Sequence, residues 1–227
     1  MWCPRNQGWL NLPPFLTENE SEETLLKQIA KSEEVSAWLS TSGREVKFRA
    51  SMRSVLVAGS IQLAMEHHAA MVTLAKHRHH ASMLALTRSI YEAYVWATWT
   101  LWIATDDQLN LLAEGRLSRG LEKMVGDLDK VRSFEEPMLK EMKPVIDKMN
   151  GFVHGGFEHL RYRIHKTGVR PQYPRDLIID ALRIADLFAI MALLDGPAID
   201  QDIPLGDRLH VEARQLLGLA NNTDSAP

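Results

Sequence analysis

The sequence predicts an all-α protein, a multi-helix bundle built on one domain. Apolar residues recur at spacings of three and four along most of the chain, as on a helix with one buried face. No sustained alternation of polar and apolar residues between turns indicates a strand. Residues 81–105 and 177–196 are apolar nearly all round, so we expect both to lie at the centre of the bundle.

An extended arm is expected over residues 1–19, because three prolines forbid a continuous helix there. The first helix is predicted over 21–40, since acidic residues at its start suit the positive end of the helix dipole. A Ser-Thr-Ser-Gly sequence ends it. A long helix is predicted over 44–76, and its partner over 80–105.

The next helix is expected to run from Asp106 through residue 132, weakened by three glycines at roughly 1 kcal/mol each. A further helix over 135–150 contains Pro144, which either kinks it or marks its first turn. The remaining predicted elements are a short helix ending near 165, a loop, helices at 176–194 and 205–219, and a disordered tail over 220–227. Residues 20–219 therefore form the single domain.

Composition limits the classes of function. The chain has 227 residues, 45% hydrophobic and 24% charged, which is ordinary for a globular protein. A formal net charge of -3 excludes a globally basic nucleic-acid binder but leaves room for a local basic patch. The single cysteine, Cys3, allows no internal disulfide, so a cytoplasmic location is the default expectation. Arg88, Glu92 and Asp186 interrupt the two apolar segments and argue against membrane spans.

Arg88 and Glu92 stand four residues apart and therefore share one face of the most apolar predicted helix. A charge in that environment must be paired. The pair is either a polar centre at the floor of a cleft, where it would contact a substrate, or a buried ion pair that fixes helix register. The tryptophans of this segment suit a core or a helix–helix dimer face.

His154 lies in the sequence Lys-Met-Asn-Gly-Phe-Val-His-Gly-Gly at residues 148–156. The two glycines let another chain or a ligand come close, and imidazole exchanges protons near neutral pH. Asn150 stands one turn earlier and would orient the ring. The alternative is a histidine that bonds a buried carbonyl group beside the end of a helix.

A basic segment follows directly at residues 159–175 and contains no acidic residue. Aromatic residues and histidines alternate with its cations, which are Arg161, Arg163, Lys166, Arg170 and Arg175. Cations with interspersed rings are typical of a surface that binds phosphates and stacks bases. A solvated helix end and loop is the alternative, because short basic runs are common.

Several histidines cluster between residues 67 and 80, which raises the alternative of a metal-binding helical protein. The spacings match no His-Glu-x-x-His or cysteine–histidine motif, and no paired Glu-x-x-His motif is present. We therefore expect surface histidines at a helix junction, no metal and no cofactor.

The segment Leu-Ala-Leu-Thr-Arg-Ser-Ile-Tyr-Glu at 84–92, with the Val-His-Gly step at 153–155, resembles helical bacterial proteins related to the HEPN superfamily. The resemblance covers roughly residues 55–195 and implies a four- to five-helix bundle, often a homodimer, with the histidine facing a cleft. Many HEPN proteins are metal-independent ribonucleases of toxin–antitoxin or defence systems. Their motif has an arginine separated from the histidine by four to six intervening residues. Asn150 and His154 match its polar residue and histidine, but Met149 stands where the arginine belongs.

Two functions are therefore expected. In the first, a dimeric HEPN-like protein of bacterial defence or stress binds RNA or a nucleotide, with an antitoxin as a further partner. If it cleaves RNA, His154 acts as general acid and base, Asn150 orients it, and the basic segment holds phosphates. In the second, the chain is a dimeric interaction module without catalysis.

Overall fold

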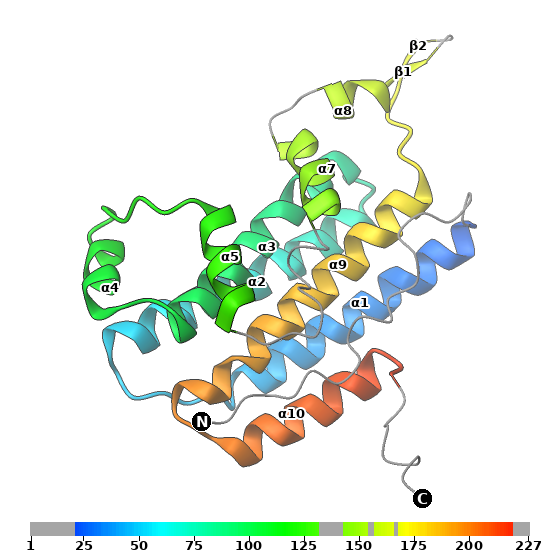
Figure 1. The fold of residues 1–227 in the computed structure, drawn as a ribbon. Coiled ribbons are helices and arrows are strands. Elements are labelled where there is room, and N and C mark those ends of the chain that lie inside the picture. The colour runs from blue at the N-terminus through cyan, green and yellow to red at the C-terminus, as the bar shows by residue number, and fades with distance from the viewer. Residues whose placement is uncertain (1–20, 132–142, 154–156, 166–167, 220–227) are drawn as a thin grey trace, which may run out of the picture.

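The computed structural model describes residues 21–131, 143–153, 157–165 and 168–219. It confirms the all-α, multi-helix bundle (Figure 1). The elements in chain order are α1 (Glu22–Gly43), α2 (Met52–Lys76), α3 (His80–Trp102), α4 (Asp106–Ala113), α5 (Leu121–Val131), α7 (Lys143–Val153), α8 (Phe157–Arg161), β1 (Ile164–His165), β2 (Gly168–Val169), α9 (Arg175–Leu194), the 3-10 helix η1 (Gly196–Ile199) and α10 (Ile203–Leu216).

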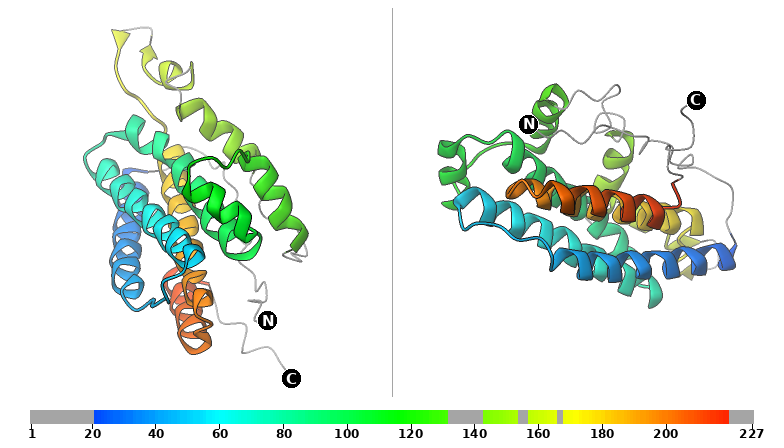
Figure 2. Two further views of the ribbon diagram at one scale, coloured as in Figure 1. Left: turned by 90° about the vertical axis from the view of Figure 1, so that its left-hand side faces the viewer. Right: turned by 90° about the horizontal axis from the view of Figure 1, so that it is seen from below.

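The core lies where α2 and α3 pack along each other and α9 packs against α1, α2 and α3. Figure 2 shows these long helices side by side in two further views. Phe188 of α9 contacts Tyr91 and Tyr94 of α3, with ring centroids 5.0 and 5.4 Å apart. All three are almost completely buried, and each contributes about 1.5–3 kcal/mol through burial. Both apolar segments are thus central, as expected.

Two predicted helix boundaries were wrong. α2 begins at Met52 rather than near residue 44, because Ser51 caps it by accepting a hydrogen bond from the Ser54 amide. In place of one helix over 106–132 there are two, α4 and α5. α4 ends before Gly115, whose φ of +66° suits glycine and stops the helix.

The end of the molecule that carries the basic segment also differs from expectation. The short helix α8 ends at Arg161, and a two-stranded antiparallel hairpin follows where the sequence predicted the last turn of that helix and a loop. Each strand has two residues, too short to give a recognisable alternation. Pro144 lies in the first turn of α7, which confirms one of its two predicted roles.

α9 and α10 begin and end within about three residues of the prediction. The predicted N-terminal arm over residues 1–19 and the predicted C-terminal tail over residues 220–227 lie outside the described residues. No described helix combines the length and the apolar character needed to cross a membrane.

Candidate functional site

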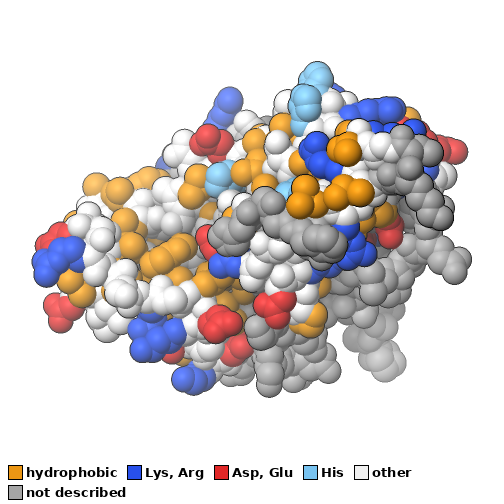
Figure 3. All heavy atoms as spheres, turned by 90° about the horizontal axis from the view of Figure 1, so that it is seen from above, with side chains coloured by type: hydrophobic (Ala, Val, Ile, Leu, Met, Phe, Trp, Pro, Cys, Tyr) orange, Lys and Arg blue, Asp and Glu red, His pale blue; other side chains and the backbone are white. Residues whose placement is uncertain are grey.

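The candidate site is the end of the bundle formed by α7, α8, the β1–β2 hairpin and the adjoining ends of α3 and α9. In Figure 1 the hairpin projects from the long helices at this end. Figure 3 shows this face from above, where Lys, Arg and His side chains are interspersed among hydrophobic ones. Asn150, Arg161, Arg163 and Arg170, which the sequence singled out, belong to this end.

Of the two predicted catalytic residues, only one is described. His154 lies outside the described residues, and so does Lys166 of the basic segment. Asn150 lies on α7, and its side-chain carbonyl oxygen is buried without a hydrogen-bond partner among the residues that the structure describes. A buried acceptor without a donor is unfavourable, so this oxygen is available to an incoming donor.

Arg88 and Glu92 form the predicted ion pair along α3, with 2.6 Å between Arg88 Nε and Glu92 Oε1. Both side chains are partly exposed, so the pair lies at the edge of the core rather than inside it. Their charges act on buried Tyr91, whose pKa is raised chiefly by burial. The Arg88–Glu92 pair therefore joins one turn of α3 to the next, and Arg88 already has an anionic partner.

Arg163 and Arg170 face each other at the base of the hairpin. The strand register pairs Ile164 with Val169, and the Arg170 amide donates to the Arg163 carbonyl oxygen at 2.9 Å. Arg161 stands two residues before Arg163 and holds its guanidinium carbon 5.2 Å from the Tyr162 ring centroid. Within the described ranges, neither Arg163 nor Arg170 forms an ion pair.

Aromatic residues of the basic segment pack against one another and against Phe152 of α7. His159 Nε2 donates to the Phe152 carbonyl oxygen at 2.7 Å, so in the neutral ring Nδ1 accepts from the Tyr173 hydroxyl at 2.9 Å. The His159 ring contacts Phe152 and Tyr173 edge-on, and the Tyr162 ring contacts the same two aromatic rings. Tyr173 is only 8% exposed, so its ring offers little surface for stacking on bases. These residues attach the hairpin to α7.

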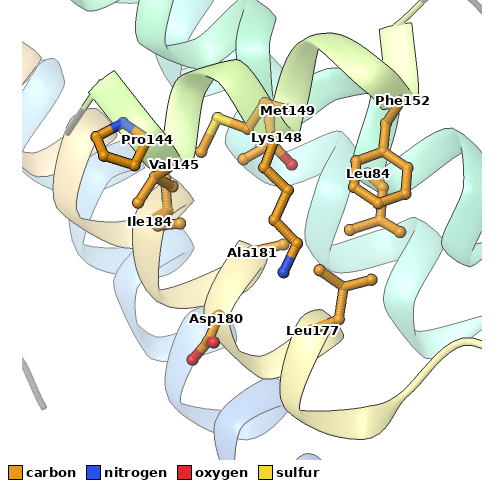
Figure 4. Close-up of a pocket in the computed structure, with 11 residues that line it drawn as sticks. Leu84, Pro144, Val145, Lys148, Met149, Phe152, Leu177, Asp180, Ala181 and Ile184 are labelled. Atoms are coloured by element: carbon orange, nitrogen blue, oxygen red, sulfur yellow. The ribbon is translucent and has the colours of Figure 1, made fainter. Parts of the chain in front are cut away.

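A cavity of about 210 Å³ lies beneath α7, between α3 and α9. Its walls are mainly apolar and include Leu84, Met149, Phe152, Leu177, Ala181 and Ile184. Figure 4 shows Lys148 reaching from α7 toward α9, near Asp180 and Leu177. Sequence reasoning missed this cavity. The available signal was the amphipathic pattern of α7, which buries Met149 and Phe152 and leaves Lys148 exposed.

A second polar centre lies inside the bundle, where His68 of α2 meets Asp186 of α9. His68 Nε2 is 2.7 Å from Asp186 Oδ1, and Ser36 Oγ is 3.0 Å from His68 Nδ1. The other carboxylate oxygen accepts from Ser32 at 2.9 Å and Gln28 at 3.0 Å. His68 is fully buried, so its predicted place on the surface was wrong.

The order serine, histidine and aspartate in this centre matches the residue types of a hydrolytic triad. Ser36, however, lies inside α1, where backbone N–H groups are used by the helix and cannot stabilise an oxyanion. Asp186 receives donors from α1 and α2 at once. The centre therefore acts as a buried connection among three helices.

The described residues contain no group of three or more histidine, cysteine, aspartate or glutamate side chains placed to hold a metal ion. Of the clustered histidines, burial lowers the pKa of His67 and His80. For His80 the positive charge of Arg78 lowers the pKa further.

No curated protein and no solved structure matches this chain. A family model matches residues 61–211, which include α3, α7, the hairpin and α9 and amount to more than half of the sequence. The chain therefore belongs to the Family of unknown function (DUF6988).

Proposed function

We propose that the protein binds RNA or a nucleotide through the basic surface formed by Arg161, Arg163 and Arg170, as a HEPN-like helical protein. The observation that carries the proposal is the pair Arg163 and Arg170 at the base of the hairpin. Like charges directly opposite each other on paired strands are destabilising. A phosphate group held between the two guanidinium groups removes that repulsion through charge-assisted hydrogen bonds.

The proposed surface suits phosphates more than bases. Its aromatic rings pack among themselves around His159, and Tyr173 is buried. Contacts to phosphates position a nucleic acid without reading its sequence. We therefore expect binding with little sequence preference and a strong dependence on salt concentration.

Any cleavage of RNA would depend on His154 as general acid and base, with Asn150 to orient it. The buried carbonyl oxygen of Asn150, unpaired among the described residues, supports this role, because such an oxygen can accept a hydrogen bond from a ring N–H group. Met149 occupies the place of the motif arginine and is only 5% exposed. The cation that stabilises the phosphate in the transition state must come from elsewhere, and Arg163 or Arg170 would supply it.

The test is fluorescence anisotropy with single-stranded RNA and with tRNA, over about 50–200 mM salt and without added metal. Arg163→Ala/Arg170→Ala should weaken binding and reduce the slope of log K against log salt by roughly 0.7 for each lost phosphate contact. The control is Arg44→Ala/Arg49→Ala, which removes two exposed arginines from the α1–α2 connection at the other end of the bundle (Figure 1). Equal binding by both double variants would refute the proposal.

Cleavage is measured separately in the same RNA pool. If the protein is a ribonuclease, His154→Ala should abolish cleavage and leave the dissociation constant almost unchanged. Binding without cleavage would fit a noncatalytic RNA-binding protein. Neither binding nor cleavage by the wild type would favour the interaction module, and light scattering would then test the expected homodimer.

A further inference from the structure

We propose that the cavity between α3, α7 and α9 binds a small apolar carboxylate, such as an aromatic or short branched-chain acid. This site does not depend on RNA binding at the hairpin. Its volume of about 210 Å³ exceeds the roughly 150 Å³ that accommodates benzene in an engineered protein cavity. One aromatic ring with a short side chain therefore fits.

The walls of the cavity select an apolar body. Leu84 comes from α3, Met149 and Phe152 from α7, and Ile184 from α9. Each of these four side chains is buried, so the helices on which they lie hold the cavity in shape. Apolar lining with a few placed polar groups is the usual character of a small-molecule site.

Lys148 supplies the charge that selects an anion. It is exposed, lines the cavity and extends from α7 toward α9 (Figure 4). Among the described residues it forms no ion pair. Asp180 also lines the cavity, but Arg183 lies 3.7 Å from its carboxylate and offsets its charge. The net effect is a cation beside an apolar cavity, which favours a ligand with one anionic end.

Thr87 supplies a second polar group from α3. The residue lines the cavity and is 2% exposed, and within the described part of the chain its hydroxyl oxygen has no hydrogen-bond partner. A helical threonine usually bonds the carbonyl group three or four residues earlier, and this one does not. Leaving a buried hydroxyl unpaired is unfavourable, so a ligand oxygen in the cavity would supply the missing partner.

The test uses phenylacetate as the probe and phenylacetamide as its neutral analogue, with binding to the full chain measured by calorimetry. Phenylacetate should bind at least about tenfold more tightly than the amide, as expected for a charge-assisted contact. Lys148→Gln should remove that preference, whereas Lys47→Gln, an exposed lysine in the α1–α2 connection, should keep it. Methyl NMR shifts caused by phenylacetate should fall on Leu84, Ala181 and Ile184.

Thr87→Val separates a binding role from a structural one, because valine keeps the shape and removes the hydroxyl. The variant should bind phenylacetate more weakly, while its thermal midpoint without ligand stays the same or rises. No binding of phenylacetate at millimolar concentration, equal binding of the amide, or methyl shifts on other helices would each overturn the proposal. Unchanged affinity in Thr87→Val would exclude the hydroxyl contact.

Discussion

Asp186→Leu should be among the most destabilising single substitutions in the bundle. Asp186 is 3% exposed, and its two oxygens accept from His68, Ser32 and Gln28. Leucine leaves these donors facing an apolar group, with two of them fully buried. Removing one partner of a buried polar pair costs about 3–5 kcal/mol. In a domain of this size each kcal/mol lowers the thermal midpoint by about 2–4 °C, so we expect a fall of roughly 6–20 °C.

The assay is urea unfolding followed by far-ultraviolet circular dichroism, with Asp207→Leu as the control. Asp207 is an exposed aspartate on α10, and a surface substitution of this kind changes the free energy of unfolding by about 0.5 kcal/mol or less. The slope of the free energy against urea should stay constant, since the same surface unfolds.

A double-mutant cycle with His68→Leu then isolates the contact between the two side chains. The double variant His68→Leu/Asp186→Leu should lose less stability than the sum of the single variants, because it no longer leaves one buried polar partner alone. A cost below about 1 kcal/mol for Asp186→Leu, or additive single effects, would refute the reasoning. Either result would mean that the His68–Asp186 contact does not hold α2 against α9.

Arg53 donates to the carbonyl oxygens of Thr100 and Ala104 at the end of α3, at 2.6 and 2.8 Å. Arg53→Met removes both hydrogen bonds, and because the side chain is only partly buried we expect a moderate fall of about 2 kcal/mol in the free energy of unfolding. Urea titration measures this fall, and equal stability of Arg53→Met and Arg49→Met would contradict the prediction. The pKa of His80 is lower in the folded protein than in the unfolded chain. As the pH falls below about 6.5, the unfolded chain is therefore protonated at His80 before the folded protein is, and stability is lost until the pH reaches the folded-state pKa. His80→Gln should therefore lose less stability than wild type between about pH 7.5 and 5.5, and an equal loss would disprove the link.

The fold class could be predicted because burial leaves a repeating pattern in the sequence. α3 and α9 are apolar nearly all round, and both lie at the centre. The sequence around His68 also shows the spacing of a buried helix face. Val57, Ile61, Ala64, His68 and Val72 are spaced by three and four residues along α2 and are all buried. That spacing identifies His68 as a core residue despite its polarity.

The boundaries that were wrong depend on contacts distant in sequence. Residues 44–51 contain ordinary helix formers, but the Arg49 amide donates to Asp200, and Val46 packs closely against Gly196. These contacts hold the connection against η1, so α2 begins only at the Ser51 cap. Propensity alone does not report such tertiary contacts.

The candidate site was only partly predictable for the same reason. The basic segment is recognisable in the sequence as a run of cations. The position of Arg163 opposite Arg170, however, depends on a hairpin with only two residues in each strand. The aromatic residues of the segment looked available for stacking until their packing around His159 was known. The cavity joins three helices that are separated by up to about a hundred residues, and no local pattern describes such a space.

Stability and binding should be separable in this protein, because different residues carry them. The His68–Asp186 contact lies among α1, α2 and α9, whereas the hairpin flanked by Arg163 and Arg170 projects from the end of the bundle (Figure 1). Substitutions at sites that share no partners usually add in free energy to within about 0.5 kcal/mol. His159 is the exception, since it bonds both the α7 backbone and Tyr173 just before α9. A change at His159 should therefore alter the position of the hairpin, and RNA binding with it, even where the core remains folded.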